Sequence, residues 1–313
     1  MSKLVNKIMY TEARALGIQH VNRHLAGIDF SSLSPADRVS MLRAILENRI
    51  HGIAFSPYMD GQGPGDQISE AQIEQRLKII EPYTSWVRTF SCVEGNEHIP
   101  RIARAHNLKT MVGVCLSDDK EKNEIELEQG IKIARQGYAD ILAVGNEVLL
   151  RGELTEQELI EYISRARQAV PGLDISYVDA YFQFEDHPAL TDACDILLIN
   201  CYPFWEECPA DYALLYMKDM YQRAVRVAKG KKVIISETGW PSYGAASGAA
   251  VPSAESAMQY FINTYLWAEQ DDIDVFYFSS FDEAWKTGDE GDVGAYWGLW
   301  DKDGNFKYAE TVS

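Results

Sequence analysis

The chain has 313 residues, of which 46% are hydrophobic and 24% charged, and its formal net charge is −18. This length suits one large domain or two small ones, and β/α barrels are commonly this long as one domain. So acidic a surface would repel a nucleic-acid backbone. No apolar stretch is long enough to span a membrane. We therefore expect no nucleic-acid partner, no membrane span and a monomeric protein.

The N-terminal residues 1–7 lack the apolar core of a signal peptide. The five cysteines lie mostly on or beside apolar stretches, which indicates buried thiols in a reducing compartment rather than a disulfide framework. No Asn-x-Ser/Thr glycosylation acceptor occurs. The sequence predicts a cytoplasmic protein, although a secreted protein whose leader had been removed would look the same.

The first fifty residues are predicted to be mostly helical. Ser34 followed by Pro and Asp is typical of a helix start, and apolar residues recur at helical spacing over residues 35–46. Residues 3–26 form a weaker amphipathic pattern. We expect residues 1–48 to be a helical extension packed on the main domain, which covers residues 49–313.

From residue 50 onward, short apolar strands alternate with amphipathic helices. The predicted strands cover residues 50–55, 86–90, 110–115, 140–147, 175–178, 196–200, 232–237 and 275–278. The predicted helices cover residues 69–82, 99–105, 125–135, 155–170, a short stretch near 189, 212–228 and 254–268. This eightfold alternation predicts an α/β protein, a (β/α)8 TIM barrel. A doubly wound open sheet is the alternative, but no phosphate-binding glycine motif follows any predicted strand.

Polar and aromatic residues gather where the predicted strands end. In a TIM barrel the active site is built from the C-terminal ends of the strands. The residues at these ends are Tyr58, Arg88, Asn146, Glu147, Asp179, Tyr181, Tyr202, Glu237, Asp282 and Glu283. Their clustering predicts a cleft at that end of the barrel.

Two of the apolar strands end in a glutamate, Glu147 and Glu237. A carboxylate at the end of a buried strand is costly unless something uses it. Two carboxyl groups whose environments separate their pKa values suit cleavage of a glycosidic bond, one as the acid and the other as the nucleophile or charge stabiliser. We expect Arg88 and Tyr202 to keep Glu237 ionised, and Asn146 to hold a sugar 2-hydroxyl.

A simpler alternative is that Glu147 and Glu237 only form ion pairs with Arg88 and Lys286 inside the mouth of the barrel. The histidines show no metal-ligand spacing beyond His20 and His24, a pair four residues apart that is usual on the surface of a polar helix. Residues 301–305 depart from the spacing of a calcium loop. We therefore expect neither a metal nor a cofactor.

Several motifs, in chain order, resemble those of glycoside hydrolase family 17, which comprises β-1,3-glucanases and related glucanosyltransferases. They include Val144-Gly145-Asn146-Glu147, Ile235-Ser236-Glu237-Thr238-Gly239-Trp240-Pro241, and segments 55–62, 87–91, 200–205 and 281–286. Residues 297–299 fit the bacterial branch of the family. The resemblance covers residues 50–308, so it is specific.

This resemblance implies a retaining enzyme in which Glu147 is the general acid/base and Glu237 the nucleophile, with carboxyl groups about 5–5.5 Å apart. The implied sugar contacts are Asn146, Tyr202, Asp282, Glu283 and Lys286, with Trp205, Trp240, Trp285 and Trp297 as candidate stacking platforms. Tyr58, Arg88 and Tyr181 join the substrate-binding set from their places at the strand ends.

One position departs from the family pattern. Phe278-Ser279-Ser280-Phe281 stands where a glutamate is expected, and Ala284 replaces the usual proline. If that glutamate contacts sugar hydroxyls, the substrate contacts of this chain differ at Ser279, whereas the two catalytic glutamates are unaffected.

Three functions remain open from the sequence. The first is hydrolysis of β-1,3-glucan through a covalent glucosyl-Glu237 intermediate that water resolves. The second is transfer of the same glucosyl group to another sugar. The third is a non-catalytic carbohydrate-binding barrel, which the presence of both carboxylates disfavours.

Overall fold

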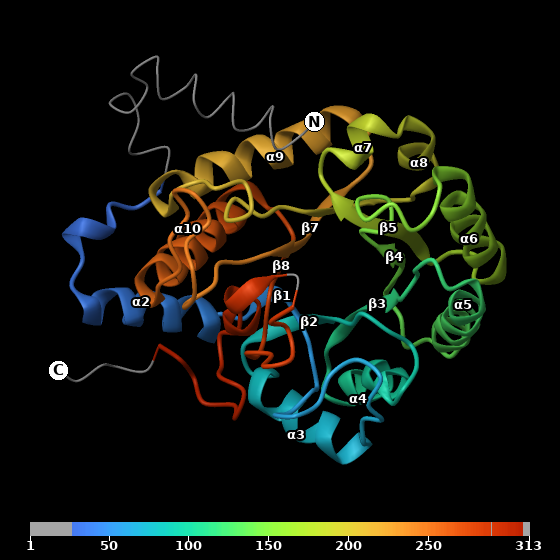
Figure 1. Cartoon of the computed structure of the whole chain (residues 1–313), viewed down its shortest axis with the longest axis horizontal. Helices are drawn as coiled ribbons and strands as arrows, with labels where there is room; N and C mark the ends of the chain where they lie inside the picture. Colours follow the sequence, from blue (N-terminus) through green and yellow to red (C-terminus); the bar gives the residue numbers. More distant parts are fainter. Residues whose placement is uncertain (1–26, 289, 309–313) are drawn as a thin grey trace.

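A closed barrel of eight parallel strands forms the centre of the protein, and helices surround it (Figure 1). The computed structural model describes residues 27–288 and 290–308. The strands are β1 (Ile50–Ala54), β2 (Thr84–Arg88), β3 (Lys109–Val114), β4 (Ile141–Asn146), β5 (Asp174–Ala180), β6 (Leu197–Asn200), β7 (Val233–Thr238) and β8 (Val275–Tyr277). Each strand pairs with the next, and β8 closes onto β1. The predicted TIM barrel is confirmed.

The helices of the outer layer follow the strands in chain order. They are α2 (Pro35–Glu47), α3 (Glu70–Ile80), α4 (Ile99–Ala105), α5 (Lys120–Arg135), α6 (Glu156–Ala169), α7 (Gln183–Asp186), α8 (Pro188–Ala193), α9 (Ala213–Val227) and α10 (Ala254–Asp271). Short 3-10 helices are η3 (Phe30–Ser32), η4 (Asn96–His98), η5 (Ala210–Tyr212) and η6 (Gly291–Tyr296). Most predicted elements are present. α5 begins earlier than predicted because the Asp119 side chain accepts a hydrogen bond from the backbone of Lys122 and caps the helix there.

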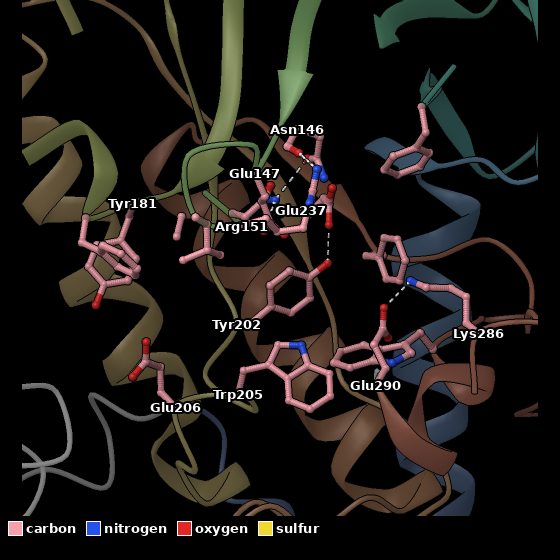
Figure 2. A pocket seen from close by; sticks show the side chains of 17 residues that line it. Asn146, Glu147, Arg151, Tyr181, Tyr202, Trp205, Glu206, Glu237, Lys286 and Glu290 are labelled. Carbon is pink, nitrogen blue, oxygen red and sulfur yellow. Dashed lines mark hydrogen bonds and ion pairs between the residues drawn. The ribbon is translucent and has the colours of Figure 1, made fainter. Parts of the chain in front are cut away.

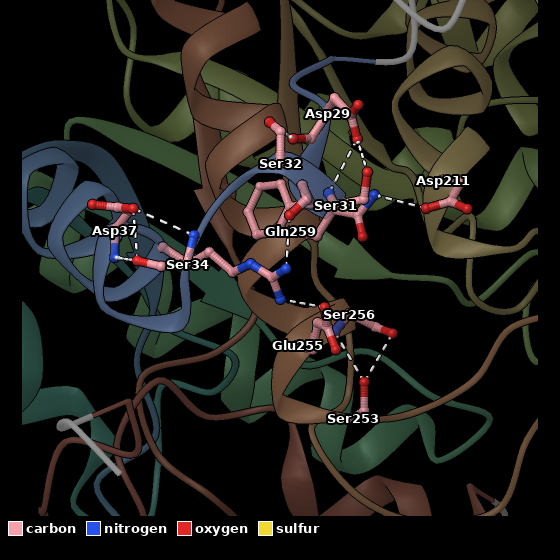
Figure 3. A network of polar contacts seen from close by, with 12 residues as sticks. Asp29, Ser31, Ser32, Ser34, Asp37, Asp211, Ser253, Glu255, Ser256 and Gln259 are labelled. Carbon is pink, nitrogen blue, oxygen red and sulfur yellow. Dashed lines mark hydrogen bonds and ion pairs between the residues drawn. The ribbon is translucent and has the colours of Figure 1, made fainter. Parts of the chain in front are cut away.

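Helix α2, ahead of the first strand, packs against α10 (Figure 3). Ser34 and Asp37 form a reciprocal capping box at the start of α2, and Arg38 pairs with Glu255 in the first turn of α10. Residues 1–26 of the predicted extension lie outside the described residues. Its amphipathic first part and the domain boundary at residue 48 therefore stay predictions.

The barrel interior is apolar near the middle of the strands. Its inward-facing cluster comprises Met111, Ile141, Ala143, Val178, Ile196, Leu198, Ile234 and Phe276. Because side chains alternate along a strand, the next inward positions lie two residues further on. On β2, β6 and β7 these positions are Arg88, Asn200 and Ser236, all buried. An apolar layer thus changes to a polar floor toward the C-terminal ends of the strands.

Register shifts interrupt the pairing of both strands that end in a glutamate. β4 shifts against β5 between Ala143 and Asn146, and β7 shifts against β6 where Asn200 pairs with Glu237. A bulge of this kind bends a strand and redirects its last side chains. Gly145 lies within the β4 irregularity at φ +90°, and a Cβ there would be 3.2 Å from the Tyr177 ring. The irregular backbone therefore aims the ends of β4 and β7 into the mouth of the barrel.

The cysteines largely match their prediction. Cys92, Cys194, Cys201 and Cys208 are buried free thiols, but Cys115 is exposed, which corrects the expectation for that residue. It follows the last residue of β3, where the chain leaves the barrel. Within residues 27–288 and 290–308, no helix combines the length and the apolar character needed to cross a membrane.

Candidate active site

A cavity of about 660 Å³, here called the first cavity, opens at the C-terminal ends of β4 to β8. Glu147 and Glu237 lie together at its deep end, with the Tyr202 and Trp205 rings beside them (Figure 2). The predicted cleft is thus present at the predicted end of the barrel.

Glu237 is buried and receives two strong hydrogen bonds. The Tyr202 hydroxyl donates to Glu237 Oε2 over 2.6 Å (Figure 2). The Arg88 guanidinium forms an ion pair with Glu237 Oε1. Burial raises the pKa of Tyr202, so its hydroxyl keeps its proton and remains a donor. A charged donor and a hydroxyl that converge on one carboxyl group stabilise its anionic form.

Glu147 occupies a different environment. It follows β4 in the left-handed region, at φ +55°, and its backbone N–H donates to Val178 O over 2.8 Å. The neutral amide of Asn200 donates to Glu147 Oε1 over 2.8 Å. Burial raises the pKa of Glu147, and the negative charge of Glu237 raises it further. These surroundings favour a protonated Glu147 beside an ionised Glu237.

A polar network on the barrel floor connects the two glutamates. Arg88 donates to Asn146 Oδ1 over 2.8 Å with the second arm of its guanidinium, and to the backbone oxygen of Ser236. Asn200 Oδ1 accepts from the Ser236 hydroxyl over 3.0 Å, which fixes the orientation of the Asn200 amide toward Glu147. Because Arg88 occupies the oxygen of Asn146, the amide nitrogen of Asn146 is left to donate into the cavity.

A second cavity, of about 670 Å³, adjoins the first on the side of β1 to β3. The two cavities share Phe90, Phe278 and Lys286 in their walls. The second one is largely aromatic and apolar, with Tyr58 and the exposed Trp285 in edge-to-face contact at 6.0 Å between ring centroids. We call these two adjoining cavities together the trough; its walls extend from Tyr58 and Trp285 to Tyr181 and Trp205.

Lys286 marks the junction of the two cavities. Its Nζ lies 4.3 Å from the centroid of the Phe278 ring and 2.9 Å from Glu290 Oε1 (Figure 2). Of the ion pairs considered as a simpler alternative, the one between Arg88 and Glu237 is present. Lys286 instead pairs with Glu290 rather than with Glu147 or Glu237.

Most of the predicted residues meet in this trough. The first cavity is lined by Asn146, Glu147, Tyr181, Tyr202, Trp205, Glu237, Lys286 and Trp297, and the second by Tyr58, Glu283, Trp285 and Lys286. Arg88 does not line the first cavity itself, but it contacts Glu237, Asn146 and the ring of Phe90, which do. Trp297 is in the wall with 2% of its surface exposed.

Two predicted sugar contacts, Trp240 and Asp282, line neither cavity. Trp240 is completely buried between Phe204 and Tyr260, and its indole N–H donates to Val251 O over 3.0 Å. It is a core residue because the chain turns back over the barrel directly after β7. No stacking platform forms at this position.

Asp282 lies in neither cavity. Its Oδ1 accepts from Lys307 Nζ over 2.7 Å and from the backbone of Gly298 over 2.9 Å. The carboxylate thus connects the segment after β8 to Gly298 and Lys307 near the end of the described residues. Ser279, at the position that departs from the family pattern, is likewise buried, and its hydroxyl donates to Phe281 O over 3.0 Å.

Asn200 directly contacts Glu147 but is not among the residues predicted for the site. It is the last residue of β6, so the strand-end criterion that found Asn146 and Glu237 also applies to it. Phe90 and Phe278 line both cavities, although the sequence indicates only that they are apolar strand residues. Their position follows from barrel closure, which no single segment reveals.

Comparison with known proteins gives consistent matches. A family model described as the BtgE/BtgC glycoside hydrolase domain matches residues 52–298. Glucan 1,3-beta-glucosidase of Candida albicans is 26% identical over 262 residues, which cover 75% of this chain and 85% of that protein. The enzyme of the same name from Saccharomyces cerevisiae is 25% identical over 266 residues, with coverages of 77% and 85%.

Solved structures agree with these matches. A glycoside hydrolase family 17 beta-1,3-glucanosyltransferase from Rhizomucor miehei superposes with a TM-score of 0.75 at 28% identity, over 83% of this chain and 96% of that chain. An active-site mutant of that enzyme in complex with laminaritriose superposes equally well. An endo-laminarinase from Formosa, 20% identical with a TM-score of 0.70, shares the fold.

Proposed function

The chain belongs to the BtgE/BtgC glycoside hydrolase family, and on this premise we propose that it cleaves β-1,3-linked glucan or gluco-oligosaccharides by a retaining mechanism. The predicted resemblance to glycoside hydrolase family 17 is confirmed, while a place in its bacterial branch stays a prediction. One observation carries the mechanism: Glu147 and Glu237 reach the same cavity from β4 and β7 in opposite electrostatic environments.

In the first step, Glu147 donates its proton to the glycosidic oxygen as the bond to the anomeric carbon breaks. Glu237 attacks the same carbon and forms a covalent glucosyl ester, and the leaving sugar departs with the proton. In the second step, the ionised Glu147 takes a proton from water, whose oxygen attacks the anomeric carbon. The ester bond breaks, the Glu237 carboxylate is restored and Glu147 is protonated again.

The surroundings of each carboxyl group support these roles. Arg88 and Tyr202 hold Glu237 as an anion whose oxygens point into the cavity, as a nucleophile requires. The raised pKa of Glu147 keeps its proton available for the leaving oxygen. The free amide nitrogen of Asn146, next to Glu147, is a donor for the 2-hydroxyl of the reacting glucose.

The shape of the trough supports an oligosaccharide or polymer substrate. Aromatic side chains lie at both ends, Tyr181 and Trp205 in the first cavity and Tyr58 and Trp285 in the second. Aromatic rings pack against the apolar faces of sugars, and the acidic cavity walls favour a neutral glycan over an anionic one. The β-1,3 linkage itself is supported by the similarity to two glucan 1,3-beta-glucosidases and to a beta-1,3-glucanosyltransferase.

Transfer of the glucosyl group to a second sugar is the other candidate. It is favoured by the match to a beta-1,3-glucanosyltransferase and by the continuation of the first cavity past Glu147 to Tyr181 and Phe182. An acceptor sugar bound there would compete with water for the same glucosyl-Glu237 ester.

Product analysis on laminari-oligosaccharides of defined length tests both functions, with cello-oligosaccharides as the linkage control. Shorter products alone indicate hydrolysis, and additional products longer than the substrate indicate transfer. Binding without any reaction would indicate a carbohydrate-binding barrel and would overturn the proposal. Faster cleavage of cello-oligosaccharides would overturn the β-1,3 preference while leaving the glycosidase activity in place.

A further inference from the structure

The segment that carries Glu147 contacts the neighbouring strand β5 through two of its backbone N–H groups. Residues 147–152 form a turn after β4 in which the backbone of Arg151 donates to Glu147 O over 2.9 Å. Two further backbone N–H groups of this turn point at β5. That of Leu149 donates to the Tyr177 hydroxyl over 3.0 Å, and that of Leu150 approaches Asp179 Oδ2 at 3.4 Å.

Tyr177 and Asp179 act as one unit. Both are completely buried, and the Tyr177 hydroxyl donates to Asp179 Oδ2. Burial raises the pKa of Tyr177, so the hydroxyl remains a donor and relays the Leu149 contact to the carboxyl group. Asp179 Oδ1 accepts from the backbone of Ala180 over 2.7 Å. Only uncharged donors contact Asp179 among the described residues, so its charge is not neutralised by an ion pair.

This carboxyl group has no role in the proposed chemistry and does not line the cavity. A buried acid without a cation costs stability, and such a cost is commonly retained at functional sites. The contacts of Asp179 lead to the turn of Glu147, whose left-handed backbone at φ +55° is strained for a residue with a side chain. The pair is therefore placed to hold the strained turn in position.

We propose that Asp179, acting with Tyr177, is the positioning residue of Glu147: it fixes the turn that aims the acid, and its charge opposes ionisation of that acid. This inference rests on the proposed role of Glu147. Tyr177 and Glu147 are the titratable groups that act on Asp179, and Glu237, Arg151 and Arg88 act on Glu147.

The direction of the electrostatic effect follows from burial and distance. Burial is the largest cause that raises the pKa of Asp179 to about 7, and the charge of Glu147 contributes to this rise. As the pH rises through this value, Asp179 becomes an anion near Glu147. The repulsion between two like charges is mutual, so the charge of Asp179 opposes ionisation of Glu147 just as the charge of Glu147 opposes ionisation of Asp179. The basic limb of the pH–rate profile, which follows loss of the proton from the acid, is the expected readout.

The test compares Asp179→Asn with the wild-type enzyme on two substrates. One is a laminari-oligosaccharide, whose leaving sugar needs a proton, and the other is an aryl β-glucoside whose activated phenolate leaves without one. We expect kcat/KM to fall about tenfold or more on the oligosaccharide, since misplacement by about 1 Å can cost 10²-fold. On the aryl glucoside it should change by less than about twofold. The basic limb should move to lower pH.

Asp174→Asn is the matched control, because it makes the same change at an exposed position on the same strand. It should leave both rates and the pH profile unchanged. Tyr177→Phe is the second variant, which removes the hydroxyl relay and keeps the carboxyl group. It should show the same split between substrates with a smaller shift of the basic limb, and it decides the question if Asp179→Asn does not fold.

Equal losses on both substrates in folded variants would mean a merely structural role and would overturn the inference. An unaltered pH profile with full activity on the oligosaccharide would overturn it too. Glu147→Gln, measured alongside, must show the split between substrates. If it does not, the role of Glu147 itself is wrong, and the inference falls with it for that separate reason.

Discussion

The ends of β4 and β7 each present a glutamate to the same cavity, but their neighbours differ. Glu237 accepts from the cation Arg88 and from Tyr202, so its anion is stabilised. Glu147 accepts from the neutral amide of Asn200, and burial raises its pKa. The difference shows that strand neighbours, rather than the glutamates themselves, separate an acid from a nucleophile in this barrel.

Replacement of Glu237 should have the largest effect on activity. Glu237→Gln removes the nucleophile, so kcat on laminari-oligosaccharides should fall by more than the roughly 10²–10⁴-fold that general acid–base catalysis contributes. Aryl glucosides should be affected equally, because their cleavage still needs the nucleophile. Steady-state rates on both substrates check this. Glu269→Gln, an exposed change on α10, is the control and should retain full activity. Normal cleavage by Glu237→Gln would refute the assignment.

Replacing Glu147 should separate the two substrates. Glu147→Gln removes the proton donor, so we expect kcat/KM on oligosaccharides to fall about 10²–10⁴-fold. The value for an activated aryl glucoside should stay near that of the wild-type enzyme, because its leaving group needs no proton. A loss of the same size on both substrates would show that Glu147 is not the acid.

Arg88→Lys should weaken the electrostatic difference between Glu237 and Glu147 and lower kcat. Lysine keeps the charge but cannot bridge Glu237 and Asn146 at once, as the guanidinium does. Loss of one charge-assisted hydrogen bond, about 1.5–3 kcal/mol, corresponds to a fall in kcat of roughly 10–100-fold. The control is Arg226→Lys at an exposed site of α9, which should change nothing. An unchanged kcat in Arg88→Lys would mean that the guanidinium of Arg88 does not orient Glu237.

The smallest expected effect concerns stability. The pKa of Glu147 is raised by folding above its unfolded value, so the stability it contributes is full below the unfolded pKa, about 4.3, and is lost as the pH rises through the folded pKa. Glu147→Gln cannot ionise. Its Tm should therefore equal that of the wild-type protein near about pH 4 and exceed it near about pH 7. Parallel thermal unfolding of the two proteins checks this, and a lower Tm of the variant at neutral pH would contradict it.

The sequence predicted the barrel and the cavity because buried parallel strands are apolar runs and their polar ends gather at one face. Glu147 and Glu237 could be found this way, as could Asn146 and Tyr202. Trp240 and Asp282 could not be placed, because the same motif positions serve either the cavity or the packing of the returning chain. That choice depends on tertiary contacts with Val251, 11 residues after Trp240, and with Lys307, 25 residues after Asp282.

The register shifts of β4 and β7 could not be predicted from the sequence either. Gly145 indicates a special backbone position, but the register shift depends on how β4 pairs with β5. For the same reason the sequence indicated Asp179 only as a residue at a strand end, and it did not indicate the pair that Asp179 forms with Tyr177. Its contacts with the turn of Glu147 exist because the barrel brings β4 and β5 together.

Covalent trapping tests the central claim most directly. A 2-deoxy-2-fluoro β-glucosyl substrate with an activated leaving group slows breakdown of the ester more than its formation, so the glucosyl-enzyme accumulates. Proteolysis and mass spectrometry then locate the attached sugar. The account predicts one 2-fluoroglucosyl group on the peptide that contains Glu237, and none in Glu237→Gln. A sugar attached to another residue, or an initial product of inverted anomeric configuration, would contradict it.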